Sequence, residues 1–159
     1  LQHLAKPLAE DREIVLEAVR RDGEALRFAA EAFSADEEVA LAAVRQSPAA
    51  LAFVAEGLLL GSDPAIDSVL KHLRSVDEST RVAALEGLSK VATSGDDEVI
   101  AEVLPCLDSP EWEVRQAAVH ALSLLAVRGQ SFVVRRVLGR LEDEHWGVRD
   151  AAARALGAL

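Results

Sequence analysis

The sequence predicts an all-α protein, built as an α-solenoid of antiparallel helix pairs. Half of its 159 residues are hydrophobic, yet only 4% are aromatic, and alanine and leucine dominate. This composition favours closely packed helices over sheets. The chain also repeats itself, with a period of 25 residues in its first third and a stricter period of 34 residues afterwards. Repeats of this length bury their apolar faces only by stacking on one another.

The first third contains two copies of one pattern, at residues 11–33 and 36–58. Aligned at a shift of 25, eleven of their 23 positions are identical. In each copy the apolar residues have the spacing of two short helices. The pattern Asp-x-Glu, an apolar pair, Ala-Val and then Asp-Gly-x-x-Leu-x-Phe-Ala resembles a repeat family of uncharacterised function that is common in protists. The resemblance implies helix pairs and no activity.

From Ser62 onward, three copies align without a gap at a shift of 34 residues, over 62–95, 96–129 and 130–159. Each copy predicts a first helix with regular apolar columns and a second helix with an alanine pair. Ser34 with Glu37 has the spacing of a capping box. Ser94 with Asp97 predicts another of the helix starts.

The second helices carry the motif that identifies the repeat type. A turn acid is followed by Val-Arg-x-Ala-Ala-x-x-Ala-Leu, which resembles short HEAT repeats of the kind also found in bilin lyases. The first copy departs from the motif at Arg74 and Thr80. Tetratricopeptide repeats share the period but need bulky aromatic positions that this chain lacks. We therefore expect a HEAT-like superhelix, with residues 1–61 as an N-terminal repeat pair and 62–159 as three HEAT-like repeats in one continuous solenoid.

Several classes of function are disfavoured. The net charge of −10 argues against binding to nucleic acid or to an anionic membrane surface. No apolar run has the length of a membrane span, and we expect a soluble intracellular protein, of unknown compartment, whose targeting segment, if any, is absent from this chain. No phosphate loop, nucleophile elbow or HExxH motif occurs, and the histidines lack metal-ligand spacing. The single cysteine, Cys106, is expected to pack as a small hydrophobe. We expect neither an enzyme nor a cofactor.

The candidate binding residues lie on the second helices, which line the concave surface of a HEAT-like stack. Their outward positions recur one turn apart: Glu78, Val82, Glu86, Trp112, Gln116, His120, Trp146, Asp150 and Arg154. The two tryptophans are the strongest candidates, because large aromatic rings dominate interface hot spots. A tryptophan just after the turn can equally cover the start of a helix, so both interpretations stay open.

Two sets of arginines allow a structural and a functional interpretation. Arg115 and Arg149 lie seven residues after Asp108 and Glu142, and each can reach the turn acid of its own or a neighbouring repeat. Together with Arg81 they form a column that is either a structural ladder or a ligand-binding row. The first helix of the last repeat has a basic edge, which is either a solvated face or a docking surface for an acidic partner. This edge consists of Arg135, Arg136 and Arg140.

The sequence thus favours a non-catalytic helical-repeat module for protein–protein interaction or scaffolding, as a subunit or segment of a larger assembly. The partner would be a protein of unknown identity. The alternative, implied by the resemblance to bilin lyases, is a chromophore-lyase-like or accessory protein that binds a tetrapyrrole in the concave groove. The last repeat lacks a polar cap, which predicts exposed apolar surface at the C-terminal end.

Overall fold

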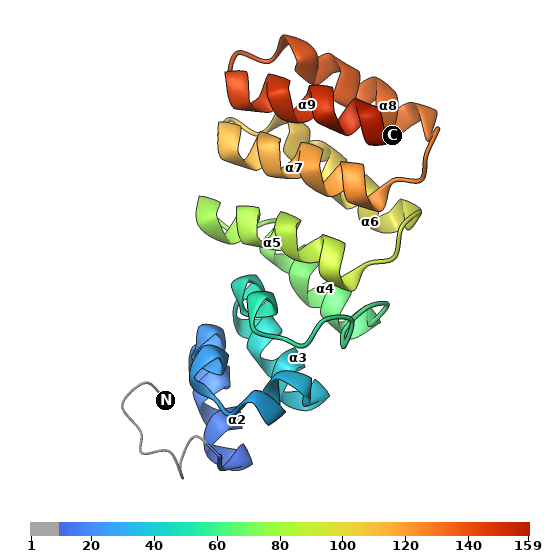
Figure 1. Ribbon diagram of the computed structural model, residues 1–159. Coiled ribbons are helices and arrows are strands. Elements are labelled where there is room, and N and C mark those ends of the chain that lie inside the picture. Colours follow the sequence, from blue (N-terminus) through green and yellow to red (C-terminus); the bar gives the residue numbers. More distant parts are fainter. Residues whose placement is uncertain (1–9) are drawn as a thin grey trace.

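A computed structural model describes residues 10–159, and these residues form a stack of helices that contains no strand. The stack runs in one direction from the N-terminal to the C-terminal end (Figure 1). Its architecture confirms the all-α solenoid. None of the helices described is both long and apolar enough to cross a membrane.

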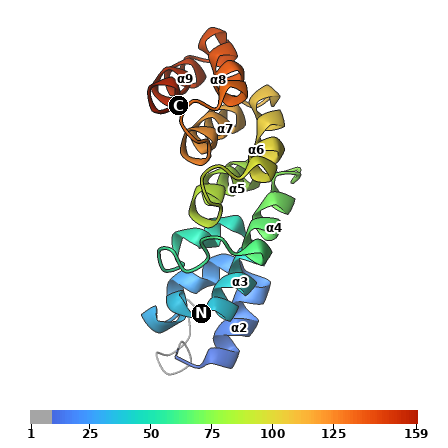
Figure 2. The same ribbon diagram turned by 90° about the vertical axis from the view of Figure 1, so that its right-hand side faces the viewer.

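The C-terminal part has two layers. The second helices lie side by side in one layer, and the first helices form the other (Figures 1 and 2). The second helices are α5 (Glu78–Val91), α7 (Trp112–Leu125) and α9 (Trp146–Ala158). The first helices are α4 (Asp63–His72), α6 (Asp97–Val103) and α8 (Ser131–Leu138). Short 3-10 turns extend two of them, namely η4 (Leu104–Asp108) and η5 (Gly139–Glu142).

The core follows the predicted columns of the 34-residue repeat. Ala84, Ala118 and Ala152 are fully buried, because their small side chains let neighbouring helices approach closely. One column changes along the stack. Leu73 is 8% and Leu107 0% exposed, whereas Leu141 in the last repeat is 39% exposed. No further helix of the described chain covers this side of the last pair.

Glycine backbone groups tie the repeats together at the ends of the second helices. Gly61, Gly95 and Gly129 recur at a shift of 34 and adopt positive φ angles of 73°, 86° and 84°. This left-handed conformation favours glycine. Their N–H groups donate, each over 2.7 Å, to carbonyl oxygens that also recur at a shift of 34, those of Val91, Leu125 and Leu159. The loop after one second helix is thereby bonded to the end of the next second helix.

The N-terminal part departs from the predicted helix pairs. Its two α-helices, α2 (Arg12–Arg21) and α3 (Glu37–Gln46), are present. The expected second helices are 3-10 turns instead: η1 (Gly23–Phe28), η2 (Glu31–Ala35) and η3 (Pro48–Ala52). Extended backbone at Ala29, with φ −77° and ψ 163°, ends η1 after six residues. Short turns already bury Leu26 and Leu51, so the apolar spacing did not require a longer helix.

The predicted capping box at Ser34 was wrong, and the helix start predicted at Ser94 lies at Asp96 instead. Asp36 caps α3 and Asp96 caps α6, each accepting hydrogen bonds from two backbone N–H groups. A carboxylate at this position also interacts favourably with the helix dipole. The Ser34 hydroxyl donates to the carbonyl of Glu31 and that of Ser94 to the carbonyl of Leu124.

Helix α3 connects the two types of repeat, because it is buried on both sides. Val39 and Ala43 belong to a buried cluster shared with α2, while Ala40 and Val44 belong to the larger cluster that continues to the C-terminal repeats. At the same junction, the Nζ of Lys90 donates to the carbonyl of Leu51 over 3.4 Å. The domain boundary between residues 61 and 62, with one continuous solenoid across it, stays a prediction.

Candidate functional site

The face of α5, α7 and α9 that carries the predicted binding positions is hollowed into a groove of about 590 Å³. It contains eight of the nine predicted residues: Val82, Glu86, Trp112, Gln116, His120, Trp146, Asp150 and Arg154. The ninth, Glu78, lines an adjoining hollow that shares Val82, Glu86 and Glu113 with the first. We call the two adjoining hollows the second-helix groove. The helical period and the 34-residue repeat were together sufficient to predict that these residues share one face. Their role in binding stays a prediction.

The aromatic rings at one end of the groove differ in their surroundings. The Trp112 ring stacks on His145, with ring centroids 3.9 Å apart and an angle of 25° between the planes. Trp146 is tilted against the same histidine at 6.0 Å. Trp112 is 38% exposed and Trp146 68%. Trp112 therefore both packs against the residue before α9 and lines the groove, whereas most of the Trp146 side chain faces solvent.

His145 was not among the predicted site residues. It precedes α9 and lies between the two tryptophans, and its Nδ1 is buried with no hydrogen-bond partner in the described part of the chain. In the sequence it follows a run of three acidic residues and has no counterpart at a shift of 34, where Glu111 stands. Only the stacking of the third repeat on the second shows that it touches Trp112.

Acidic side chains dominate the electrostatics of the groove. Glu78, Glu86 and Glu113 form no ion pair within residues 10–159. Loss of hydration raises the pKa of Glu78, and Glu113 raises it further together with Glu111. Asp150 is neutralised by Arg154, which donates to it one helical turn later. The groove thus has an excess of negative charge beside exposed indole rings.

The arginine column forms a structural ladder, but with other acids than predicted. Arg115 donates from Nε and Nη2 to Asp143 of the next repeat, both over 2.9 Å, and does not contact Asp108. Its Nη1 donates to the carbonyls of Ser109 and Pro110, each over 2.9 Å. Arg81 likewise pairs with Glu111 of the next repeat at 3.0 Å. The partner acids lie just before the next second helix, one to three residues beyond the predicted turn acids, because the arginine reaches across the stack.

The buried pair of this ladder, Arg115 with Asp143, changes the pKa of Asp143. The side chains of Arg115 and Asp143 are only 6% and 4% exposed. Burial by itself would raise the pKa of Asp143, but the hydrogen bonds from Arg115 and from the backbone N–H of His145 outweigh it and hold the pKa below its usual value. All of the donor groups of Arg115 point at protein acceptors, so it has no donor left for a ligand.

Two of the three arginines in the predicted basic edge already interact with the preceding repeat. Arg136 pairs with Asp108 at 2.6 Å. Arg140 donates to the carbonyl of Leu107 over 2.9 Å and lies 3.5 Å from the same carboxylate. Both arginines are therefore engaged by the preceding repeat. Within the described residues Arg135 forms no ion pair and is exposed.

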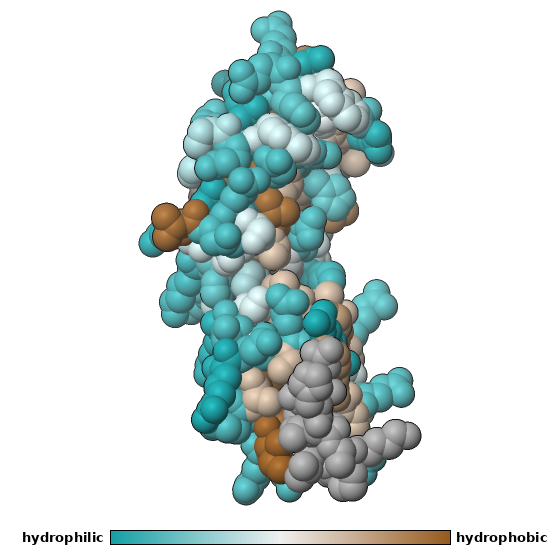
Figure 3. Space-filling view, turned by 90° about the vertical axis from the view of Figure 1, so that its left-hand side faces the viewer, coloured by the Kyte–Doolittle hydropathy of each residue, from teal (hydrophilic) through white to brown (hydrophobic). Residues whose placement is uncertain are grey.

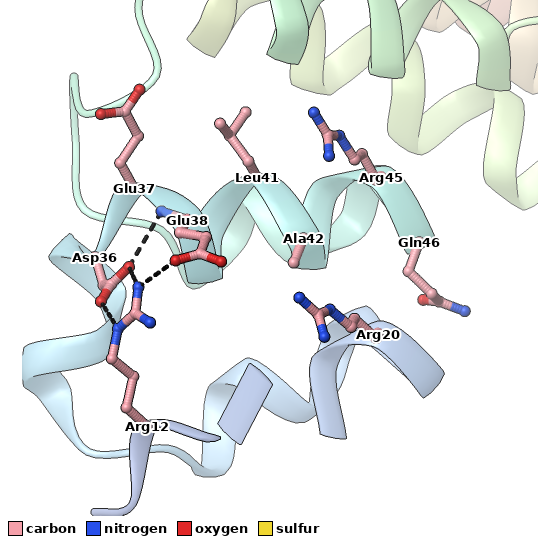
Figure 4. Close-up of a pocket in the computed structure, with 9 residues that line it drawn as sticks. All are labelled: Arg12, Arg20, Asp36, Glu37, Glu38, Leu41, Ala42, Arg45 and Gln46. Carbon is pink, nitrogen blue, oxygen red and sulfur yellow. Dashed lines mark hydrogen bonds and ion pairs between the residues drawn. The ribbon is translucent and has the colours of Figure 1, made fainter. Parts of the chain in front are cut away.

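A second, wider hollow of about 850 Å³ lies between α2 and α3 (Figure 4). On one side Arg12 forms ion pairs with Asp36 at 2.7 Å and Glu38 at 2.6 Å. The hydrogen bond from Arg12 lowers the pKa of Asp36. Arg20 and Arg45, equivalent positions of the two 25-residue copies, lie across the hollow from this ion pair (Figure 4).

Groups of side chains that could hold a metal are not found within residues 10–159. Cys106 packs against the main buried cluster, and burial raises the pKa of its thiol. This placement agrees with a cysteine that packs as a small hydrophobe.

Comparisons with known proteins agree with the division into two kinds of repeat. The HEAT repeat matches residues 99–127 and 133–159, which are the second and third 34-residue copies. A domain of unknown function (DUF4116) matches residues 11–59, which contain both 25-residue copies. A search of the curated proteins gave no match. The chain is thus a helical-repeat protein, and its last two repeats are similar to HEAT repeats, a class that typically mediates interactions between proteins.

Proposed function

We propose that the protein is a non-catalytic interaction module, acting as a subunit or segment of a larger assembly, and that it holds a protein partner in the second-helix groove. The observation that carries this proposal is the exposure of two indole rings, on equivalent positions of successive repeats, at the side of one continuous groove. Stacked repeats provide an extended surface of this kind. The HEAT matches support the same class of function.

The tryptophans are the expected anchors of the partner. Tryptophan is enriched among interface residues that contribute most to binding, since its large ring loses much hydration on contact. Trp146 gives the better test of the anchor, because it is more exposed than Trp112 and so contributes less to the stability of the fold. Glu86, Glu113 and Asp150 line the same hollow as the two rings and supply polar groups beside them.

Replacing Trp146 with alanine tests the proposal. Partner proteins recovered with the tagged wild-type chain, quantified by mass spectrometry, are expected to fall at least tenfold with Trp146→Ala, while the thermal midpoint changes little. Phe132→Ala is the matched control, because Phe132 is also an exposed aromatic residue but lies on the first-helix layer, outside the groove. Equal recovery with Trp146→Ala and the wild type would remove the groove from the proposal.

A second candidate, the binding of a tetrapyrrole, has one observation in its favour. The main hollow of about 590 Å³ lies within the roughly 300–1,000 Å³ range of small-molecule sites, and aromatic rings line it. Tetrapyrrole binding would fit HEAT repeats of the type found in bilin lyases. We also propose that the two N-terminal copies belong to the repeat family common in protists. Absorbance titration with a linear tetrapyrrole at micromolar concentration tests the ligand. A spectrum identical to that of the free pigment would exclude it.

A further inference from the structure

The second-helix groove has a charge pattern that points to a particular kind of partner. Six charged or titratable side chains line its two hollows on the helices themselves: Glu78, Glu86, Glu113, His120, Asp150 and Arg154. The only guanidinium of this set belongs to Arg154, and the adjacent Asp150 already accepts a hydrogen bond from it. Three carboxylates therefore remain without an ion pair from the described residues.

Two of these carboxylates are brought close together by the stacking of α7 on α5. Glu78 and Glu113 line the same hollow. Loss of hydration raises the pKa of Glu78, and the neighbouring Glu113 and Glu111 raise it further. The nearest arginine, Arg81, cannot relieve the repulsion fully. Its Nη2 pairs with Glu111 at 3.0 Å, and its Nη1 donates to the carbonyls of Ser75 and Val76.

The carboxylates of Glu78 and Glu113 therefore lack a positively charged partner among the described residues. Carboxylates that face each other at a partly dehydrated surface repel, and a cation placed between them removes the repulsion and gains two attractive contacts. The rings of Trp112 and Trp146 line the same groove, and the face of an indole attracts a cation through its quadrupole. Carboxylates and indole faces thus both select positive charge.

We infer that the groove takes a cationic protein segment, whose lysine or arginine side chain lies between Glu78 and Glu113 while its neighbouring residues contact Trp112 and Trp146. This inference rests on the proposed function and adds the chemistry of the partner.

Fluorescence anisotropy with three labelled dodecapeptides tests the sign of the charge. The peptides share one alanine–leucine framework and differ only in four positions, which hold lysine, glutamine or glutamate. At about 0.15 M salt the screening length is about 8 Å, so charges far from the groove contribute little. The lysine peptide is expected to bind the wild-type chain at least tenfold more tightly than the glutamine peptide, and the glutamate peptide more weakly than either.

The double variant Glu78→Gln/Glu113→Gln locates the effect. It is expected to weaken the lysine peptide about five- to tenfold, as two partly exposed ion pairs would. The matched control, Glu13→Gln/Glu98→Gln, removes the same charge from the exposed faces of α2 and α6 and is expected to change the affinity less than twofold. Equal weakening by both variants would mean general attraction to an acidic surface and would overturn the inference.

The remaining outcomes separate this inference from the proposed function. A lysine peptide that binds no better than the glutamine peptide overturns the cationic segment. If the glutamine peptide still loses affinity with Trp146→Ala, the groove nevertheless remains a protein-binding site. Conversely, a lysine peptide sensitive to the carboxylates but not to Trp146→Ala upholds the charge preference and contradicts the tryptophan anchor.

Discussion

At the scale of the residue, Arg115 shows how one side chain holds two repeats together. Its guanidinium is buried and bonds a carboxylate of the next repeat along one edge and two carbonyls of its own turn along another. The planar, bidentate geometry is specific to arginine. Removal of one partner from a buried pair is far more destabilising than the pair itself is stabilising, because the other charge stays buried.

We expect Arg115→Ala to destabilise the chain by about 3–5 kcal/mol, since Asp143 would keep a buried charge. Arg149, the equivalent residue of the last repeat, is exposed and donates only to the carbonyls of Asp143 and Glu144. Arg149→Ala is expected to cost below about 1.5 kcal/mol. Urea unfolding followed by circular dichroism measures both. Similar losses for the two variants would contradict the importance of the buried carboxylate.

At the scale of the element, the N-terminal copies use short 3-10 turns where the C-terminal copies use full helices. Gly23 shows how closely these turns approach α3. A Cβ atom at this position would lie 2.3 Å from the backbone oxygen of Ala43. Its own N–H donates to the side-chain oxygen of Gln46 over 2.6 Å. The equivalent residue of the second copy is Pro48, which has no N–H, so the contact is not repeated.

Gly23→Ala is expected to destabilise the chain by about 1–3 kcal/mol, because η1 would have to move away from α3. Gly157→Ala provides the comparison: this glycine is in α9, and an added Cβ would meet no atom within 4 Å. Alanine there should be neutral or stabilise by up to about 1 kcal/mol through helix propensity. Thermal unfolding of both variants distinguishes them. A Gly23→Ala protein as stable as the wild type would show that η1 is not held against α3.

At the scale of the whole molecule, carboxylates link successive repeats in both the N-terminal and the C-terminal part. Asp36 receives Arg12 in the N-terminal part, and Asp143 receives Arg115 in the C-terminal part. Hydrogen bonds from these arginines help to hold both aspartate pKa values below their usual range. A folded-state pKa below the unfolded value near 3.8 contributes stability that is fully present above that value and is lost as the pH falls through the folded-state pKa.

Stability is therefore expected to change little from neutral pH to about pH 5 through these groups, and to fall steeply below about pH 4. Asp143→Asn should lower stability at neutral pH and flatten this acid-induced loss, since the titrating carboxyl is gone. Asp67→Asn, at an exposed position of α4, controls for the change of charge. The thermal midpoint measured from pH 7 to pH 2 gives the slope. An unchanged slope in Asp143→Asn would contradict the linkage.

Periodicity predicted most of the fold and the membership of the groove, because both depend on which positions recur. The columns through Ala118 and Val103 and the outward row through Trp112 followed directly from the 34-residue period. Contacts between repeats were harder to predict. The pairing of Arg115 with Asp143 and the stacking of His145 on Trp112 depend on how one repeat is offset from the next. Composition and spacing within a single copy do not contain that offset.

The two ways of joining repeats lie at opposite ends of the second helices, and this has a mechanical consequence. At the glycine end, three backbone hydrogen bonds of 2.7 Å set a constant spacing. At the arginine end, the links change from one pair to the next: Arg81 with Glu111 is partly exposed, whereas Arg115 with Asp143 is buried. The repeats are thus joined uniformly at the glycine end of the second helices and unequally at the arginine end. Added salt weakens exposed ion pairs far more than buried pairs or backbone hydrogen bonds, so added salt should loosen the arginine edge between α5 and α7 and leave the buried link between α7 and α9 closed.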